Sequence, residues 1–288
     1  MKRIAACWLL LSLSTLVSAQ KGKPLYKAEI GLQTYTFRNS FPKNILATLD
    51  TIKAMGIKEL EAGPPKGMTA QEFRKACDER GLKIPSTGGG YDQLVKNPQA
   101  TIEQAKILGA RYVMCAWIPH ERGNFNLENA KKAVADFNAI GKAMKENGLT
   151  FCYHNHGYEF KKYGDGASTP GTLMDYIIQN TNPEYVSFEM DILWTIHGGG
   201  DPVALLKKYG SRWKLMHLKD LKKGVVGDGS GGTPPENDVV LGEGQADFVG
   251  ILKEANRIGI RHFFIEDESN DEYVQVPKSI AYLKSLRE

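Results

Sequence analysis

Acidic residues and histidines recur at the ends of four short β-rich stretches in the second half of the chain. These stretches read YHNH at 153–156, SFEMD at 187–191, KLMHLKD at 214–220 and FIEDE at 264–268. A carboxylate buried at the end of a strand must be paired or bind a cation, because burying a bare charge is costly. Two or three carboxylates with one imidazole suit Mn²⁺, Co²⁺, Mg²⁺ or Zn²⁺. We therefore expect one divalent metal ion at Asp191, His217 and Glu266.

Each of these residues also has a plainer explanation. A structural ion pair would account for either acid alone, and a hydrogen-bonded core histidine would account for His217. What favours a common site is that the residues fall on successive strands, since scattered surface charge has no reason to follow the period of a strand and helix unit.

The elements that position these residues repeat eight times from residue 29 onward. The expected strands are 29–37, 58–62, 83–87, 111–117, 150–156, 185–191, 213–220 and 261–268. The expected helices are 42–55, 69–80, a third ending near 108, 127–147, 172–179, 202–209, 246–257 and 276–286. Glycines such as Gly56, Gly81 and Gly109 end a helix shortly before the next strand.

Eight strand and helix units in about 260 residues predict a single-domain (β/α)8 TIM barrel, an α/β fold. The alternative is an open doubly wound sheet, which usually carries a glycine-rich phosphate loop after its first strand. The corresponding segment here, residues 36–40, reads TFRNS. In a barrel the chemistry sits at the carboxyl ends of the strands, where the acids and histidines lie.

The first nineteen residues are expected to be a secretory signal. Lys2 and Arg3 precede an apolar run from 4 to 17, and small residues follow up to Ala19. The alternatives are a buried helix or a membrane anchor, but a run of roughly 14 residues is shorter than the ~20 that span a bilayer. We expect cleavage after Ala19, a barrel domain over 20–288, a periplasmic or secreted location and no stable membrane insertion of the mature chain.

The composition limits the kinds of partner. The chain has 288 residues, of which 42% are hydrophobic and 24% charged, with a net charge of +4. These fractions are typical of a globular protein and lack the dense basic character of a nucleic-acid binder. We expect a small-molecule partner and no nucleic acid.

The motifs together resemble the xylose isomerase-like TIM barrels. They are HNHGYEF at 154–160, Asp191 with Trp194 and GDP at 200–202, HLKD at 217–220, GEG at 242–244 and Glu266. This superfamily of sugar phosphate isomerases and epimerases also contains inosose dehydratases, ketose epimerases and endonuclease IV. The resemblance covers nearly the whole mature chain and implies a barrel enzyme without defining its substrate.

The resemblance also implies a ligand set for the metal. Family epimerases bind it with a Glu, an Asp, a His and a Glu from strands five to eight, and the last three match Asp191, His217 and Glu266. The strand-five ligand is either His154 or Glu159. We favour Glu159, which gives three carboxylates and leaves His154 facing the substrate.

The activity implied is that of an isomerase or epimerase acting through an enediolate on a neutral keto-sugar. Glu159 and Glu266 would carry protons, His154 would contact the substrate, and Lys219 would stabilise an oxyanion or protonate a leaving group. The same enolisation also suits a lyase or dehydratase that eliminates a β leaving group from a 3-keto-glycoside or keto-sugar. A sugar-binding barrel without catalysis is a further alternative.

Other residues near strand ends are expected to line the substrate pocket. His156 would bond substrate hydroxyls, Glu61 and Trp117 end the second and fourth strands, and Arg38 could meet an anionic group. The glycine-rich stretch 224–244 is long for a loop of this kind and reads as a lid or rim over the substrate. Barrels of this type often associate, so a homo-oligomer remains an open expectation.

Overall fold

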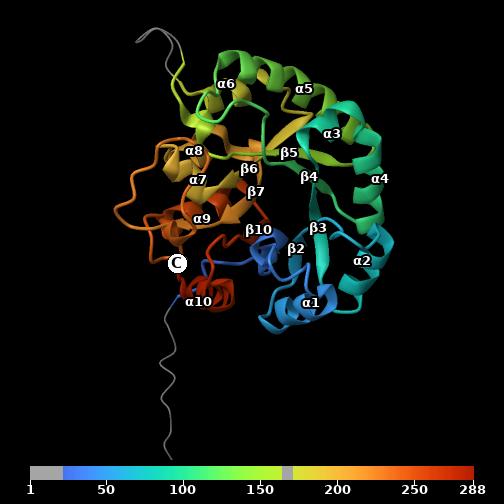
Figure 1. Cartoon of the computed structure of the whole chain (residues 1–288). Helices are drawn as coiled ribbons and strands as arrows, with labels where there is room; N and C mark the ends of the chain where they lie inside the picture. The colour runs from blue at the N-terminus through green and yellow to red at the C-terminus, as the bar shows by residue number, and fades with distance from the viewer. Residues whose placement is uncertain (1–21, 164–170) are drawn as a thin grey trace, which may run out of the picture.

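The strands of the chain close into a ring that the helices surround (Figure 1). The structure is a computed structural model and describes residues 22–163 and 171–288. The expected signal at 1–19 lies outside these residues. The ring holds β1 (Gly31–Gln33), β2 (Glu59–Glu61), β3 (Lys83–Gly88), β4 (Tyr112–Cys115), β5 (Thr150–His154), β6 (Val186–Asp191), β7 (Trp213–Leu218) and β10 (His262–Ile265). All neighbours in it are parallel, which confirms the single-domain (β/α)8 barrel.

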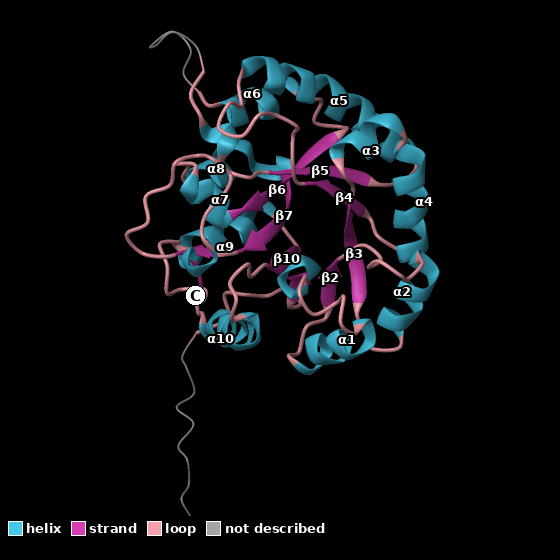
Figure 2. Cartoon of the chain, in the orientation of Figure 1, coloured by secondary structure: helices cyan, strands magenta, loops and turns pink. Residues whose placement is uncertain are grey.

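The helices form the outer layer of the barrel (Figure 2). They are α1 (Ile45–Ala54), α2 (Ala70–Asp78), α3 (Tyr91–Lys96), α4 (Pro98–Leu108), α5 (Leu127–Glu146), α6 (Leu173–Asn180), α7 (Ile192–His197), α8 (Pro202–Tyr209), α9 (Phe248–Ile258) and α10 (Glu272–Ser285). Their apolar faces pack on the strands in one large core. Of the helices in residues 22–163 and 171–288, none has both the length and the apolar character that spanning a membrane requires.

The register of the sheet brings the chemically interesting strand ends together. Asp191 at the end of β6 is the Cα partner of His217 on β7. His154 at the end of β5 is the partner of Glu189 on β6. Glu266 follows β10 directly, and its backbone N–H donates to the carbonyl of Leu218 at 3.2 Å. The acids and imidazoles therefore share the carboxyl-terminal edge of the barrel, as expected for this fold.

Several elements differ from the expectation in ways that local hydrogen bonds explain. The first strand stops at Gln33, because its side chain accepts the backbone N–H of Tyr35 and turns the chain into a 3-10 helix at Thr34–Phe37. The third helical segment is divided into α3 and α4. Helix α7 follows β6 without a loop, because the carboxylate of Asp191 accepts the N–H of Trp194 and caps the helix.

The glycine-rich stretch after β7 is pinned to the barrel. It contains a short antiparallel ribbon of β8 (Asp220–Leu221) and β9 (Asp238–Val239). The Asp220 carboxylate accepts the backbone N–H groups of Gly242, Gly244 and Ala246 at 2.9, 2.9 and 3.0 Å. A Cβ at Gly244 would collide with that carboxylate, which explains the GEG motif. This end of the stretch is an anchored rim.

We predict that replacing Asp220 with alanine lowers the free energy of unfolding by about 3 kcal/mol, since three hydrogen bonds to a charged acceptor are lost. Urea unfolding followed by circular dichroism measures the change. Asp247→Ala is the control, because that carboxylate accepts one N–H at the start of α9 and its loss should cost about 1 kcal/mol. Equal losses in the two variants would contradict the anchoring role of Asp220.

Candidate active site

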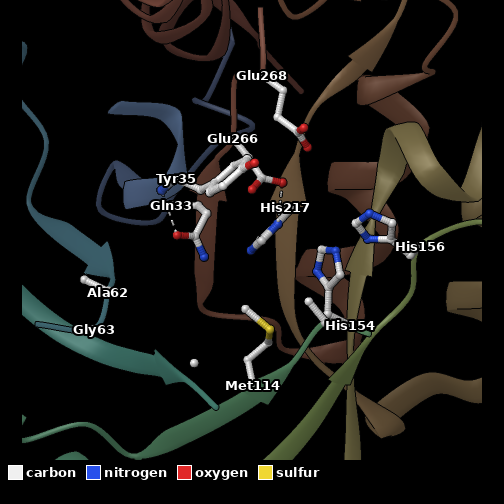
Figure 3. Close-up of a pocket in the computed structure, with 12 residues that line it drawn as sticks. Gln33, Tyr35, Ala62, Gly63, Met114, His154, His156, His217, Glu266 and Glu268 are labelled. Atoms are coloured by element: carbon white, nitrogen blue, oxygen red, sulfur yellow. Dashed lines mark hydrogen bonds and ion pairs between the residues drawn. The ribbon is translucent and has the colours of Figure 1, made fainter. Parts of the chain in front are cut away.

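A cavity of about 370 Å³ opens at the carboxyl-terminal end of the barrel (Figure 3). We call it the site cavity. Its lining comes from strand ends and the loops after them, and consists of Gln33, Tyr35, Ala62, Gly63, Gly88, Met114, Ala116, His154, His156, His217, Glu266 and Glu268. The volume falls in the range of small-molecule sites, about 300–1,000 Å³. Polar groups gather on the side formed by β5, β7 and β10.

His217 is the centre of this polar group, and its two ring nitrogens face different acids. Nδ1 lies 3.2 Å from Oε2 of Glu266 and 3.8 Å from Oδ2 of Asp191. Nε2 lies 2.8 Å from Oε1 of Glu61 and 3.4 Å from Oε1 of Glu189. If Nε2–H donates to Glu61, the lone pair on Nδ1 is left facing Asp191 and Glu266. That tautomer is the one a metal-binding histidine adopts when a carboxylate holds its other nitrogen.

Two sets of three side chains come close enough to share an ion. Ligand atoms of His154, Asp191 and His217 all lie within 4.8 Å of one another, and so do those of Glu61, Glu189 and His217. In the first set, Oδ2 of Asp191 and Nδ1 of His154 are buried without a hydrogen-bond partner. Orphaned buried polar atoms of this kind are costly unless something binds them. Both carboxylate oxygens of Glu189 in the second set also lack a partner. The two sets meet at His217, and the first, which has Glu266 beside it and reaches the site cavity through His154, fits a metal ion that is open to a substrate.

The charges around His217 also call for a cation. Burial, with repulsion from Glu61, raises the pKa of Glu189 well above its ordinary value. Burial raises the pKa of Asp191 to about 7, although Lys219 acts in the opposite direction. Burial lowers the pKa of His154 well below the ordinary value, which keeps that imidazole neutral and able to act as a ligand. A divalent ion would supply the missing positive charge.

Asn155 fixes the position of Asp191. Its side-chain carbonyl accepts the backbone N–H of Asp191 at 3.1 Å, and its amide donates to the carbonyl of Asp191 at 3.3 Å and to Oγ1 of Thr195 at 3.1 Å. Asn155 is fully buried. The middle residue of the HNH motif thus locks the end of β5 to the end of β6.

Glu159 lies outside both sets of converging ligands and does not line the site cavity. One carboxylate oxygen accepts the hydroxyl of Tyr153, and both oxygens face the backbone N–H of His156, at 2.9 and 3.2 Å. These bonds occupy the carboxylate in holding the turn after β5. This placement counts against Glu159 as the strand-five ligand and leaves His154 in that position.

Glu61 also departs from its expected role. It is fully buried below the cavity rather than lining it. Its carboxylate accepts hydrogen bonds from Gln33 at 2.7 Å, from Ser86 at 2.5 Å and from His217 at 2.8 Å. Its oxygens are engaged with protein donors, so this placement gives no support to the expected role in substrate binding. Glu61 orients His217.

Lys219 is a buried cation beside Glu266. Its Nζ lies 3.4 Å from Oε2 of Glu266 and 3.8 Å from Oδ2 of Asp238, and it also contacts Glu268. Burial alone would lower the pKa of Lys219, but Glu266 and Glu268 raise it well above its ordinary value. A protonated amine is thus held next to a carboxylate at the edge of the cavity.

The remaining expected pocket residues divide between the cavity and its surroundings. His156 lines the cavity and stacks on Trp194, with ring centroids 4.7 Å apart. Trp117 does not line it and instead packs edge-on against His156, with ring centroids 5.3 Å apart. Arg38 lines smaller clefts beside the cavity and donates to the carbonyl of Glu268 at 2.7 Å.

Comparison with known families matches this architecture. The family described as xylose isomerase-like TIM barrel matches residues 49–286. The chain belongs to this family. The match spans the strands from β5 to β10 that bring the acids and histidines together, and it starts inside α1.

Individual relatives of this family member are distant. An inosose dehydratase of Clostridium beijerinckii is 25% identical over 190 residues, which cover 59% of this chain and 61% of that protein. A sugar phosphate isomerase/epimerase structure from Parabacteroides distasonis has a TM-score of 0.75 at 24% identity, covering 96% of this chain and 98% of that one. A structure of the IolI protein with a bound zinc atom has a TM-score of 0.69 at 15% identity, covering 89% and 95%.

Some residues of the site had no clear signal in the sequence. Glu189 lies two residues before Asp191 and has the same inward parity, which is the one hint that it reaches the interior. Gln33 and Glu268 line the cavity from places that read as ordinary polar strand ends. Asn155 lies between two histidines, which are the more usual metal ligands, so its structural role was not predicted.

We predict that Glu159→Ala lowers the free energy of unfolding by about 3 kcal/mol, because Tyr153 and the N–H of His156 lose a buried charged acceptor. Thermal and urea unfolding measure this. Glu128→Ala is the control, since that side chain is 79% exposed and its removal should cost less than about 0.5 kcal/mol. A Glu159→Ala variant of unchanged stability would show that the carboxylate does not hold this turn.

Proposed function

We propose that this family member is a metal-dependent carbohydrate lyase or dehydratase that removes a proton next to a ketone and eliminates a β leaving group. The observation that carries the proposal is the contact, 3.4 Å long, between Glu266, which lines the site cavity, and Lys219, which lines an adjoining cleft. A proton acceptor and a proton donor thus stand together beside the candidate metal ligands.

The metal is proposed to be held by His154, Asp191, His217 and Glu266. Two imidazoles and two carboxylates favour ions such as Zn²⁺, Co²⁺ or Mn²⁺ over Mg²⁺, which prefers oxygen ligands alone. When bound, such an ion polarises a carbonyl and a neighbouring hydroxyl oxygen and stabilises the negative charge that develops there. Glu61, whose Oε1 lies 2.8 Å from Nε2 of His217, keeps that imidazole oriented.

Two residues of the chain, Glu266 and Lys219, then carry out the two proton transfers. Glu266 accepts the proton from the carbon next to the ketone, and the electron pair left behind forms the new carbon–carbon double bond. The bond from the β carbon to the leaving oxygen breaks, and Lys219 donates a proton to that oxygen. The contact between Glu266 and Lys219 lets the proton return to the amine, so no outside reagent is needed.

Elimination is favoured over epimerisation by the one-sided arrangement of these groups. Epimerisation replaces the proton from the opposite face and so needs a second proton carrier there, the role expected of Glu159. The carboxylate of Glu159 is engaged with Tyr153 and His156, whereas Glu266 and Glu268 both follow β10. The name of the inosose dehydratase relative agrees with elimination. The expected substrate is a neutral 3-keto-glycoside or keto-sugar.

We predict that Asp191→Ala and His217→Ala each weaken divalent-metal binding by at least about 100-fold. His154→Ala should behave in the same way, because it replaces Glu159 as the strand-five ligand. Inductively coupled plasma mass spectrometry after dialysis measures the metal stoichiometry. Isothermal titration calorimetry with Zn²⁺, Mn²⁺ and Mg²⁺ measures the affinity. Glu159→Gln is the matched control and should retain the metal. A His154→Ala variant that is folded and fully loaded would refute this ligand set.

We predict that Lys219→Arg lowers the rate of elimination by about 100-fold or more while proton removal persists, because the charge is kept and an arginine donates its proton poorly. The assay is NMR in D₂O with a 3-keto-glucoside, following deuterium exchange and release of the aglycone separately. Lys222→Arg, the same change at an exposed position, is the control. Exchange by the unmodified enzyme without bond cleavage would instead identify an isomerase or epimerase.

A further inference from the structure

Tyr35 stands between the site cavity and two smaller clefts. Its side chain lines all three and is 52% exposed. Figure 3 shows its ring at the cavity. The hydrogen bond from its backbone N–H to Gln33 holds the turn in place, and the guanidinium of Arg38 lies 5.1 Å from the ring centroid. An exposed aromatic ring beside a catalytic cavity offers apolar surface to a second part of a substrate.

One of the two clefts lies on the side of Lys219. We call it the Pro234 cleft; it is lined in part by Tyr35, Trp194, Lys219, Pro234, Pro235 and Glu268, and its volume is about 130 Å³ on the scale on which the site cavity measures 370 Å³. Its lining combines the rings of Tyr35 and Trp194 and the two prolines with Thr233 and the charged side chains of Arg38, Lys219, Asp238 and Glu268. A dry cavity of about 150 Å³ is enough to take up a benzene-sized ring. The Pro234 cleft therefore suits one planar ring better than a second sugar.

Trp194 supplies an independent sign of a ligand in this cleft. The residue is 3% exposed, and its indole N–H is buried without a hydrogen-bond acceptor. A buried donor without an acceptor is costly, so an oxygen atom of a bound molecule would stabilise it. The Nζ atom of Lys219 lies 5.2 Å from the centroid of the same indole, which places the amine and the indole together.

We propose that the Pro234 cleft binds the aglycone of the substrate, a single planar aromatic ring joined to the keto-sugar through oxygen. This inference rests on the proposed lyase function and names its leaving group. The ring lies against Tyr35 and the prolines, and the oxygen faces Lys219 and the indole N–H of Trp194. When the carbon–oxygen bond breaks, the oxygen keeps the electron pair, takes the proton of Lys219, and the aglycone departs as a neutral phenol.

The test compares phenyl and methyl 3-keto-glucosides with the metal-loaded enzyme. The unmodified enzyme should show a lower KM for the phenyl than for the methyl compound. Tyr35→Ala should raise the KM for the phenyl compound about fivefold more than for the methyl compound, because only the aromatic aglycone loses a stacking partner. Tyr35→Phe should restore the preference. Val274→Ala, at a position in α10 that is 54% exposed, is the control for unchanged kinetics.

The possible outcomes test the aromatic subsite and the elimination reaction separately. If the enzyme releases both alcohols with equal KM values and Tyr35→Ala changes both equally, elimination stands and the aromatic subsite is refuted. If it releases neither, the lyase proposal fails and its leaving-group site fails with it. A preference for phenyl that disappears in Tyr35→Ala and returns in Tyr35→Phe supports both.

Discussion

The site depends on the contacts between the imidazole of His217 and the four carboxylates that enclose it. Glu61 and Glu189 approach one nitrogen from below, and Asp191 and Glu266 approach the other from above. So many buried acids around one ring are unfavourable without compensating positive charge, since each loses its hydration. Glu61 orients the ring through its hydrogen bond, and in the proposed ligand set Asp191 and Glu266 share a divalent cation with it.

The order of the strands explains how this arrangement arises and why the sequence reveals much of it. Strand-length apolar runs alternate with helical periodicity, which is enough to predict a barrel. A barrel in turn predicts that Asp191, His217 and Glu266 share an edge, and the Cα pairing of Asp191 with His217 agrees. Parity and strand order determine at which edge a residue on a regular strand lies, which is why these three could be grouped from the sequence.

The side chains that lie elsewhere than expected are those whose surroundings strand order and parity do not determine. Glu159 follows a turn after β5, and only the hydrogen bonds to Tyr153 and His156 show that it faces the scaffold. Glu61 does end a strand. Whether its inward-facing carboxylate contacts substrate or another side chain depends on how deep it lies along the barrel axis, and strand parity does not predict that depth. The expected lid is tied at its end by Asp220, a contact across 22 to 26 residues.

The closure of the ring has a consequence for how the polypeptide reaches its native state. Gly31 on β1 is the partner of Phe264 on β10, and the backbone N–H of Leu25 donates to the carbonyl of Leu286. The chain therefore has to be translated through β10 before β1 finds its second neighbour. Such distant pairing slows folding and leaves one edge each of β1 and β7 unpaired until then, where strands of other chains could add.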